Sequence, residues 1–235
     1  MEGFSYNNIF DTKGIEYLVI IAFLLSIIPF WIIINKPGIV SRIKKSLGIF
    51  SASTLRVPAG LFYSRNHTWA HLEKSGTARV GLDDFILHVT GEVSLGSLLK
   101  PGDTIKKGEL LASIDHNGKL LNIFSPVTGT ITGTNTGLCQ EPDALMEDPY
   151  GKGWIYKIKP TQWIEETSNY YLADDAVAWA KMEVERVKEF VAVSSAKYST
   201  NSKFAVLQDG GELFDNPLSE LPDEVWHDFQ KTFLS

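Results

Sequence analysis

Hydrophobic residues between 58 and 160 recur in short runs separated by turn residues. TARVGL at 77–82 alternates apolar and polar positions, and LLASI at 110–114 and LLNIF at 120–124 are apolar runs of strand length. Pro-Gly, Asn-Gly and Thr-Gly pairs interrupt these runs at short intervals. The pattern predicts a mainly β domain, a compact antiparallel sandwich or barrel with a helical turn over 83–89, rather than a series of βαβ units.

After Trp163 the hydrophobic period changes from that of a strand to that of a helix. Apolar residues recur at spacings of three and four, and Trp179 and Phe190 lie beside them, which predicts one long helix with a broad apolar face. This helix packs either on its own domain or in the groove of a partner. The periodic positions are Ala173, Val177, Ala180, Val184, Val187 and Val191.

Two further elements are predicted near the C-terminus. The stretch KFAVLQDGGELF at 203–214 predicts a hairpin with its turn at 209–211. A last short helix begins near Pro222, because acidic residues follow that proline and apolar residues then recur on one side. Residues 163–235 therefore form a helical extension with a hairpin.

The N-terminal region contains a long apolar stretch. Residues 17–34 read YLVIIAFLLSIIPFWIII, 18 residues without a charge. A helix of this length approaches the thickness of the hydrocarbon layer, so we predict a transmembrane helix over 17–35. A cleaved signal peptide fits less well, since the start is acidic and no small-residue cleavage site follows closely. A buried core helix is the other alternative.

The charges flanking this stretch predict its orientation. Lys and Arg follow it without acidic residues, and such an excess is typical of cytoplasmic flanks. We therefore expect a single-pass protein of the inner or plasma membrane, with residues 1–16 outside and the bulk of the chain cytoplasmic. Residues 36–57 form a basic linker, which either lies on anionic headgroups or is solvated.

Composition and motifs exclude several functions. The formal net charge of −6 argues against nucleic-acid binding, and the single cysteine, Cys139, allows no disulfide within the chain. His67 and His71 lack the glutamate of a zinc-binding H-E-x-x-H helix, and no nucleophile elbow, phosphate-binding loop or C-x-x-C pair occurs. We expect no metal and no catalytic site, and so a protein that is not an enzyme.

Two motifs in the β-rich region are more informative about function than the composition is. A tyrosine is followed by His-x-Trp and a Val-Gly strand, and residues 147–154 read EDPYGKGW. Together with Pro-Val-Thr-Gly at 126–129, they make residues 58–162 resemble the glycine cleavage system H protein family. The residues that carry the resemblance are Tyr63, His67, Trp69, Gly81, Pro126, Gly129, Asp148, Pro149, Tyr150, Gly151 and Trp154.

The resemblance implies a fold and a cofactor. It implies a flattened β-sandwich or barrel of the lipoyl-domain type, with short helices at its edges. It also implies a lysine at a hairpin tip that carries lipoate, on an arm that visits partner enzymes.

The chain departs from the family at the lipoyl-lysine position. Counted from Gly108 to Pro126 without gaps, Gly118 falls on the family's lysine and Lys119 comes one residue late. Asn-Gly at 117–118 predicts a two-residue type I′ turn, which makes Lys119 the first residue of the returning strand. Because one residue of displacement turns a strand side chain to the opposite face, Lys119 is expected to miss the attachment site.

Two functions follow from these patterns. The first is a membrane-anchored, non-catalytic H-like domain without a cofactor. It would dock to protein subunits of a cytoplasm-facing membrane complex, for example a respiratory or redox complex. The alternative is a lipoylated carrier of the glycine cleavage type, with lipoate on Lys119.

Overall fold

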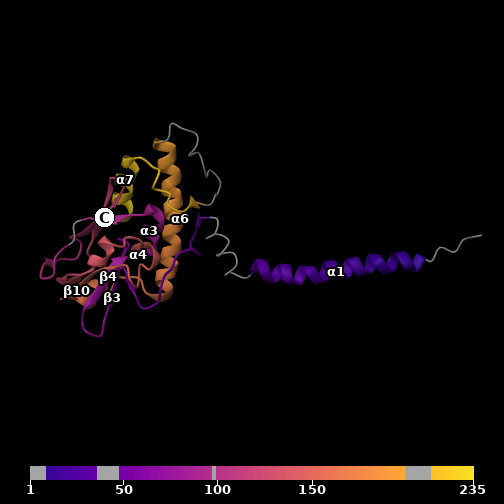
Figure 1. The fold of residues 1–235 in the computed structure, drawn as a ribbon, viewed down its shortest axis with the longest axis horizontal. Coiled ribbons are helices and arrows are strands. Elements are labelled where there is room, and N and C mark those ends of the chain that lie inside the picture. Colours follow the sequence, from indigo (N-terminus) through magenta and orange to yellow (C-terminus); the bar gives the residue numbers. More distant parts are fainter. Residues whose placement is uncertain (1–8, 36–47, 97–98, 199–212) are drawn as a thin grey trace, which may run out of the picture. The chain divides into compact units, whose positions relative to one another are not determined.

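The computed structural model describes residues 9–35, 48–96, 99–198 and 213–235. The chain forms two compact units, residues 1–47 and 48–235, which we describe separately (Figure 1). The first unit contains helix α1, Ile9–Asn35, with Pro29 inside it. The second unit contains the other helices and the strands of the described ranges.

Helix α1 covers the apolar stretch in which we predicted a transmembrane helix. No helix within the described ranges has the length and apolar character that crossing a membrane requires. The predicted inner- or plasma-membrane localisation, with a cytoplasmic bulk, is therefore wrong. Residues 1–8 and 36–47 of the predicted N-terminal segment and linker lie outside the described residues.

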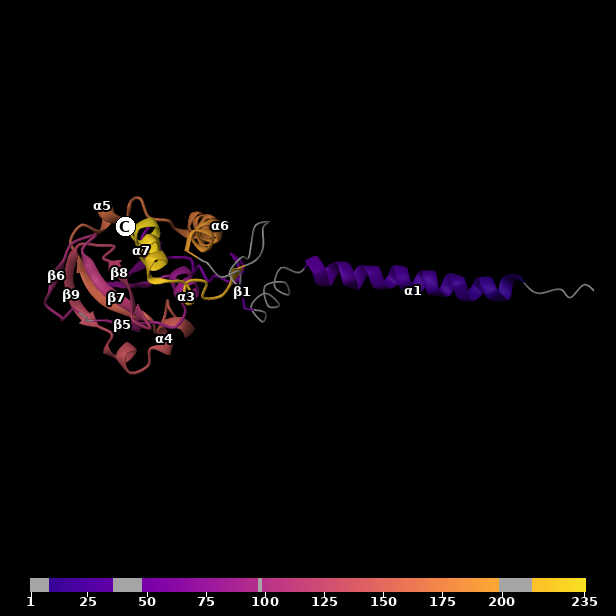
Figure 2. The same ribbon diagram turned by 90° about the horizontal axis from the view of Figure 1, so that it is seen from above.

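The second unit is an antiparallel β-sandwich, as the alternation of short runs and turns predicted. Two sheets face each other, and a short pair of strands lies beside them (Figure 2). The six-stranded sheet has the order β2 Phe62–Tyr63, β3 Thr68–Leu72, β4 Ala78–Leu82, β10 Trp154–Pro160, β9 Gly129–Thr134 and β6 Thr104–Ile105. The three-stranded sheet has the order β5 Ser94–Leu95, β7 Leu110–His116 and β8 Lys119–Phe124.

Helices lie at the edges of this sandwich. The turn predicted over 83–89 is helix α3, in which the Asp83 side chain accepts a hydrogen bond from the Ile86 amide and caps the first turn. The helices and the 3₁₀ turn of the second unit are α3 Asp84–Thr90, η1 Thr136–Cys139, α4 Asp143–Glu147, α5 Trp163–Thr167, α6 Ala173–Tyr198 and α7 Asp223–Phe233.

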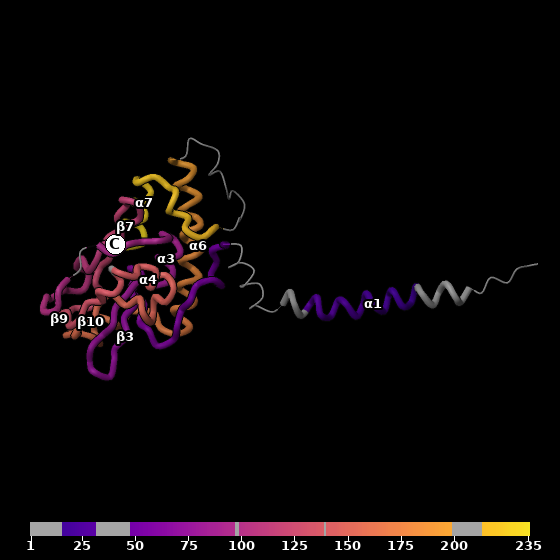
Figure 3. Tube along the Cα trace, viewed as in Figure 1, coloured from indigo at the N-terminus to yellow at the C-terminus, as the bar shows by residue number. Residues whose placement is uncertain are grey.

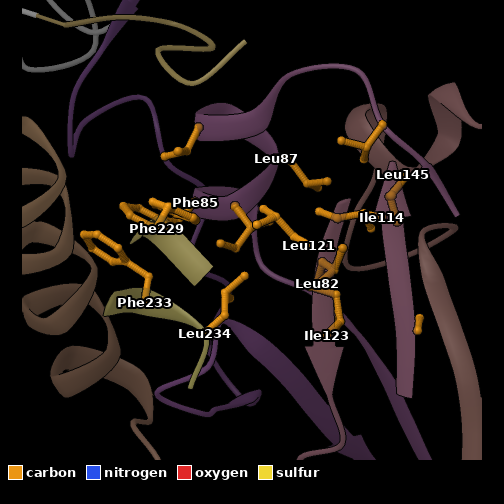
Figure 4. Close-up of a cluster of buried hydrophobic side chains, with 14 of the residues drawn as sticks. Leu82, Phe85, Leu87, Ile114, Leu121, Ile123, Leu145, Phe229, Phe233 and Leu234 are labelled. Atoms are coloured by element: carbon orange, nitrogen blue, oxygen red, sulfur yellow. The ribbon is translucent and has the colours of Figure 1, made fainter. Parts of the chain in front are cut away.

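The main hydrophobic core joins the sandwich to the C-terminal extension. Side chains from β4, β7 and β8 meet those of α3 and α7 (Figure 4). Phe229 and Phe233 of α7 stack with ring centroids 4.6 Å apart, and Phe229 is fully buried. The extension is therefore part of the folded core. The labelled core residues are Leu82, Phe85, Leu87, Ile114, Leu121, Ile123, Leu145, Phe229, Phe233 and Leu234.

Helix α6 confirms the predicted long helix and packs on its own domain. Trp179, Val184 and Val187 are buried against the sandwich, and Phe190 meets the rings of α7. Figure 3 shows α6 and α7 side by side. Val177, which we placed on the apolar face, is 53% exposed, because the buried stripe reaches the predicted Ala180 from Ala176 and not from Val177.

The predicted hairpin at 203–214 is described only at its end. Residues 199–212 lie outside the described residues. The described end is β11, Leu213–Phe214, which pairs antiparallel with β1, Ile49–Phe50. The segment that precedes the sandwich and the segment that follows it are thus joined by a ladder of two residues on each strand. The local sequence pattern does not indicate this pairing.

If α7 belongs to the cooperative core, then Phe229→Ala should lower the free energy of unfolding by about 3–5 kcal/mol, because a buried ring is lost. Phe214→Ala is the matched control, since Phe214 is 66% exposed. We expect it to change stability by no more than about 0.5 kcal/mol. Guanidinium unfolding followed by circular dichroism measures both. Equal effects would mean that α7 is not integral to the core.

Candidate functional site

The hairpin of β7 and β8 contains the lysine that the family resemblance singles out. His116 pairs with Lys119, so the loop has two residues, and Asn117 and Gly118 have φ angles of 54° and 89°. These positive angles are those of a type I′ turn. The Asp115 side chain accepts a hydrogen bond from the Gly118 amide at 3.0 Å. The predicted tight turn is confirmed, and Lys119 begins the returning strand.

The Lys119 ammonium group is bound by the C-terminal extension. Its Nζ donates to the carbonyl oxygens of Leu221 at 2.6 Å and Ser219 at 3.1 Å. Its charge also lies 5.7 Å from the centre of the Trp226 ring. The extension therefore surrounds the one amine that the hairpin offers near its tip.

The loop before α7 is held in the shape that these bonds need. The indole Nε1 of Trp226 donates to the Leu218 carbonyl at 2.9 Å, which ties the loop to the helix that follows it. The same indole stacks on His116 of the hairpin, with ring centroids 5.7 Å apart. His116 donates through Nδ1 to the Glu92 carbonyl at 2.6 Å. Trp226 thus links the hairpin to the carbonyl groups that hold Lys119.

A glutamine of α7 closes the free edge of β8. The Asn122 amide donates to Gln230 Oε1 at 2.6 Å, and Gln230 Nε2 donates to the Asn122 carbonyl at 3.1 Å. The side-chain amide thereby pairs with the backbone as a neighbouring strand would. An unpaired edge strand invites pairing with another chain, and this contact removes that opportunity at Asn122.

The remaining signature residues build structure rather than a reactive site. Trp69 is fully buried, and Gly81 lies opposite it in the sheet. A Cβ on Gly81 would come within 2.8 Å of the Trp69 ring, so a glycine is needed there. Tyr150 and Trp154, from the other end of the resemblance, pack against the same cluster. The two motifs are therefore parts of one packing unit.

Tyr63 and Tyr150 tie this cluster to neighbouring loops. The Tyr63 hydroxyl donates to the Pro58 carbonyl at 3.1 Å. The Tyr150 hydroxyl donates to the Arg56 carbonyl at 2.8 Å and accepts from the Asp84 amide at 3.0 Å. Burial raises the pKa of both phenols, so both remain neutral hydrogen-bonding groups.

Asp148 shapes the loop that carries Tyr150. Its carboxylate accepts from the amides of Gly151 at 3.0 Å and Lys152 at 2.9 Å. A Cβ on Gly151 would lie 2.2 Å from this carboxylate, and a Cβ on Gly153 would lie 2.7 Å from the Cα of Pro149. The Asp-Pro-Tyr-Gly motif is thus a compact turn held by its own aspartate.

Pro126 and Gly129 flank the start of β9. The Pro126 carbonyl accepts from the Tyr170 hydroxyl at 2.5 Å. A Cβ on Gly129 would lie 2.3 Å from the Lys159 carbonyl, so the close approach of β9 and β10 requires glycine. Both positions are explained by packing.

A buried ion cluster centred on His67 was not predicted. His67 has a φ of 56° and is 1% exposed, and its Nδ1 lies 2.8 Å from Asp83 Oδ2. Its Nε2 lies 3.7 Å from Glu183 of α6, beyond hydrogen-bond length but close enough for an ion pair. Burial opposes the charge on His67, but the two carboxylates outweigh it and raise the pKa of His67 to about 9.

A second histidine joins α3 to the C-terminal extension. His88 Nδ1 lies 2.9 Å from Asp215, and its Nε2 lies 3.5 Å from Asp84, which also pairs with Arg56 at 2.6 Å. Burial again disfavours the charge, and the hydrogen bonds to the two aspartates raise the pKa of His88 to about 9. The sequence spacing of 127 residues between His88 and Asp215 gives no local signal for this pair.

Metal binding finds no support in the described ranges. No group of three or more His, Cys, Asp or Glu side chains there has the arrangement to hold a metal ion. His71, the partner of His67 in the rejected zinc motif, directs Nδ1 to the Gly60 carbonyl at 3.3 Å.

The fold and the hairpin define the class of protein: a lipoyl-domain-like β-sandwich with a lysine next to the hairpin tip. The family model described as "Glycine cleavage H-protein" matches residues 61–183. The chain belongs to the glycine cleavage H-protein family, as the sequence motifs indicated.

Two sequence relatives agree with this assignment, and one solved structure is similar over part of the chain. The probable glycine cleavage system H protein of Pyrococcus abyssi is 35% identical over 111 residues, which cover 47% of this chain and 82% of the relative. The glycine cleavage system H protein of Thermus thermophilus is 35% identical over 104 residues, covering 44% and 80%. A crystal structure of an H protein from Mycobacterium marinum aligns with a TM-score of 0.47 at 23% identity, covering 52% of this chain and 98% of that one.

The two histidine clusters predict a stability that falls with rising pH. Both pKa values are about 9 in the folded chain, above the ordinary value of 6.5, so the folded state binds more protons than the unfolded state between these values. The stabilisation is complete below pH 6.5 and is lost as pH rises to 9, by up to about 3 kcal/mol for each histidine. Guanidinium unfolding at pH 6, 7.5 and 9 measures the slope.

His67→Gln should reduce the change of the free energy of unfolding with pH. His227→Gln is the control and should leave that change as it is in the wild-type protein, because His227 is exposed and belongs to neither cluster. If His67→Gln does not fold, the imidazole resonances of the wild-type protein, followed by NMR against pH, report the two pKa values directly. A free energy of unfolding that stays level or increases from pH 6 to pH 9 would contradict the assignment.

Proposed function

We propose that this H-family protein is a non-catalytic docking module whose hairpin lysine holds its own C-terminal extension and carries no lipoate. The observation behind the proposal is the binding of the Lys119 ammonium by the carbonyls of Ser219 and Leu221. An ammonium has three N–H donors, and this one uses two of them on the extension.

Lipoylation of Lys119 would dismantle this arrangement. The amide formed with lipoate keeps one N–H and no charge, so it cannot bond both carbonyls or attract the Trp226 ring. The lipoyl chain would also have to leave through the loop at 218–222 and the start of α7. As arranged, the hairpin does not fit a lipoyl group on Lys119.

The outer face of the hairpin supports a docking role. Leu110 and Leu120 are 54% and 59% exposed and lie on the side of the hairpin that faces away from the core. Half-buried Phe124 pairs with Leu110 on that face. Exposed apolar side chains on a rigid hairpin are suited to contact with another protein.

A lipoyl carrier remains the second candidate, and family membership is the observation that favours it. The curated relatives are named as glycine cleavage H proteins. In that case the segment 213–235 would have to detach from the hairpin, so that Lys119 becomes available to a modifying enzyme and the lipoyl arm becomes free to move.

Mass spectrometry of the full chain distinguishes these functions. We expect the purified protein to have its unmodified mass. We also expect no mass increase after incubation with lipoate, ATP and a lipoate–protein ligase. Gln230→Ala removes the two hydrogen bonds between α7 and Asn122, and should increase the lipoylation of Lys119 by the ligase relative to the wild-type protein. Gln162→Ala is the matched control, because Gln162 is exposed and makes no cap bond.

The wild-type result decides between the two functions. One lipoyl group on wild-type Lys119, located by peptide mapping, would overturn the proposal and establish the carrier. A lipoyl group on any other lysine would contradict the expected unmodified mass and would also overturn the proposal that the protein is a docking module without a cofactor.

A further inference from the structure

A cavity of about 500 Å³ opens at the end of β8 that is distant from Lys119. Phe124 lines it and lies five positions along β8 from Lys119, roughly 17 Å along the strand. The volume lies within the range of small-molecule sites, about 300–1,000 Å³. The cavity is therefore separate from the hairpin tip and independent of the proposed role of Lys119.

The charge of this cavity is opposite to that of the whole chain. Arg65 and Lys107 are among its lining residues, and no Asp or Glu is, although the formal net charge of the chain is −6. Arg65 is exposed, and no described residue forms a hydrogen bond or ion pair with its guanidinium. A free guanidinium presents donors in a planar fork that matches carboxylate or phosphate oxygens.

Lys107 is held in position at the same cavity. Its Nζ donates to the Glu166 carbonyl at 2.6 Å and lies 4.5 Å from the centre of the Tyr170 ring. The Glu166 carboxylate is engaged elsewhere, because it accepts from the Thr128 amide at 2.7 Å and from the Thr128 hydroxyl. The positive charge of Lys107 is thus fixed at the cavity without a carboxylate bound to it.

The cavity also has neutral donors and an apolar wall. The amide side chains of Asn66 and Asn169 line it, and no described residue hydrogen-bonds to them. Phe124 and Tyr170 supply aromatic surface, and the Tyr170 ring is fixed by the bond from its hydroxyl to the Pro126 carbonyl. Polar groups that converge beside an apolar wall are typical of a site for an organic ligand.

We propose that this cavity binds a small organic oxyanion, a carboxylate or a phosphate monoester, attached to a flat apolar body. Arg65 forms the paired hydrogen bonds to the anion, and Lys107 adds a fixed positive charge. Asn66 and Asn169 donate to the remaining oxygens. Phe124 and Tyr170 contact the apolar body.

Calorimetric titration of the full chain tests this site with four probes. Benzoate and phenyl phosphate carry the two oxyanions on the same ring, benzylamine carries a cation on that ring, and inorganic phosphate lacks the ring. We expect benzoate or phenyl phosphate to bind more tightly than benzylamine and inorganic phosphate. The tighter of the two identifies the oxyanion.

Variants of the lining residues test the assignment of roles. Arg65→Ala should weaken the binding of the tighter-binding oxyanion probe by about ten-fold or more. Arg65→Lys should weaken that binding less, because lysine keeps the positive charge but lacks the planar fork of donors. Lys74→Ala is the control, since Lys74 is an exposed cation outside the cavity. Circular dichroism checks that each variant is folded.

Three results would overturn the site: no binding of either oxyanion, benzylamine binding as tightly as the anions, or unchanged affinity in folded Arg65→Ala. Each is independent of the state of Lys119, so it leaves the proposed function of the hairpin intact. Loss of binding in Arg65→Ala with retention in Lys74→Ala would support the site.

Discussion

The two-residue turn at Asn117-Gly118 determines where Lys119 lies, and much of the account depends on that position. The turn requires positive φ angles at both residues, and the structure has them. With the register of β7 and β8 fixed in this way, Lys119 is opposite His116 at the first position of the strand. From there its amine reaches the carbonyls of the loop before α7 rather than solvent beyond the tip.

The C-terminal extension is attached to the sandwich by interactions of three kinds. Phe229 and Phe233 enter the main core, Gln230 pairs with the edge of β8, and buried histidines bind carboxylates of the extension. Because the charged histidines are buried, removing one partner leaves an uncompensated charge and is costly. The segment that surrounds Lys119 is therefore anchored well away from the lysine, which keeps the loop at 218–222 in place.

Local sequence patterns predicted the elements better than their partners. The type I′ turn, the helix at 83–89, the long helix α6 and the short helix α7 each depend on neighbouring residues, so their signals are present in short windows. The pairing of β1 with β11 and the contact of His88 with Asp215 join residues far apart in the chain, and no periodicity reports them. His67 was recognised as part of a motif, but its carboxylate partners appear only in the folded chain. The apolar run in α1 was interpreted from its length, its purity and its flanking charges, and the membrane localisation inferred from it was wrong.

The central claim is that the Lys119 amine is committed to the extension in the folded protein. Brief labelling of the native full chain with an amine-reactive ester, quantified for each lysine by peptide mass spectrometry, measures this most directly. The account predicts that Lys119 reacts about ten-fold or more slowly than exposed Lys74, because two hydrogen bonds must break before the amine can react. Denaturation should remove the difference. Equal labelling of Lys119 and Lys74 in the native chain would contradict the claim.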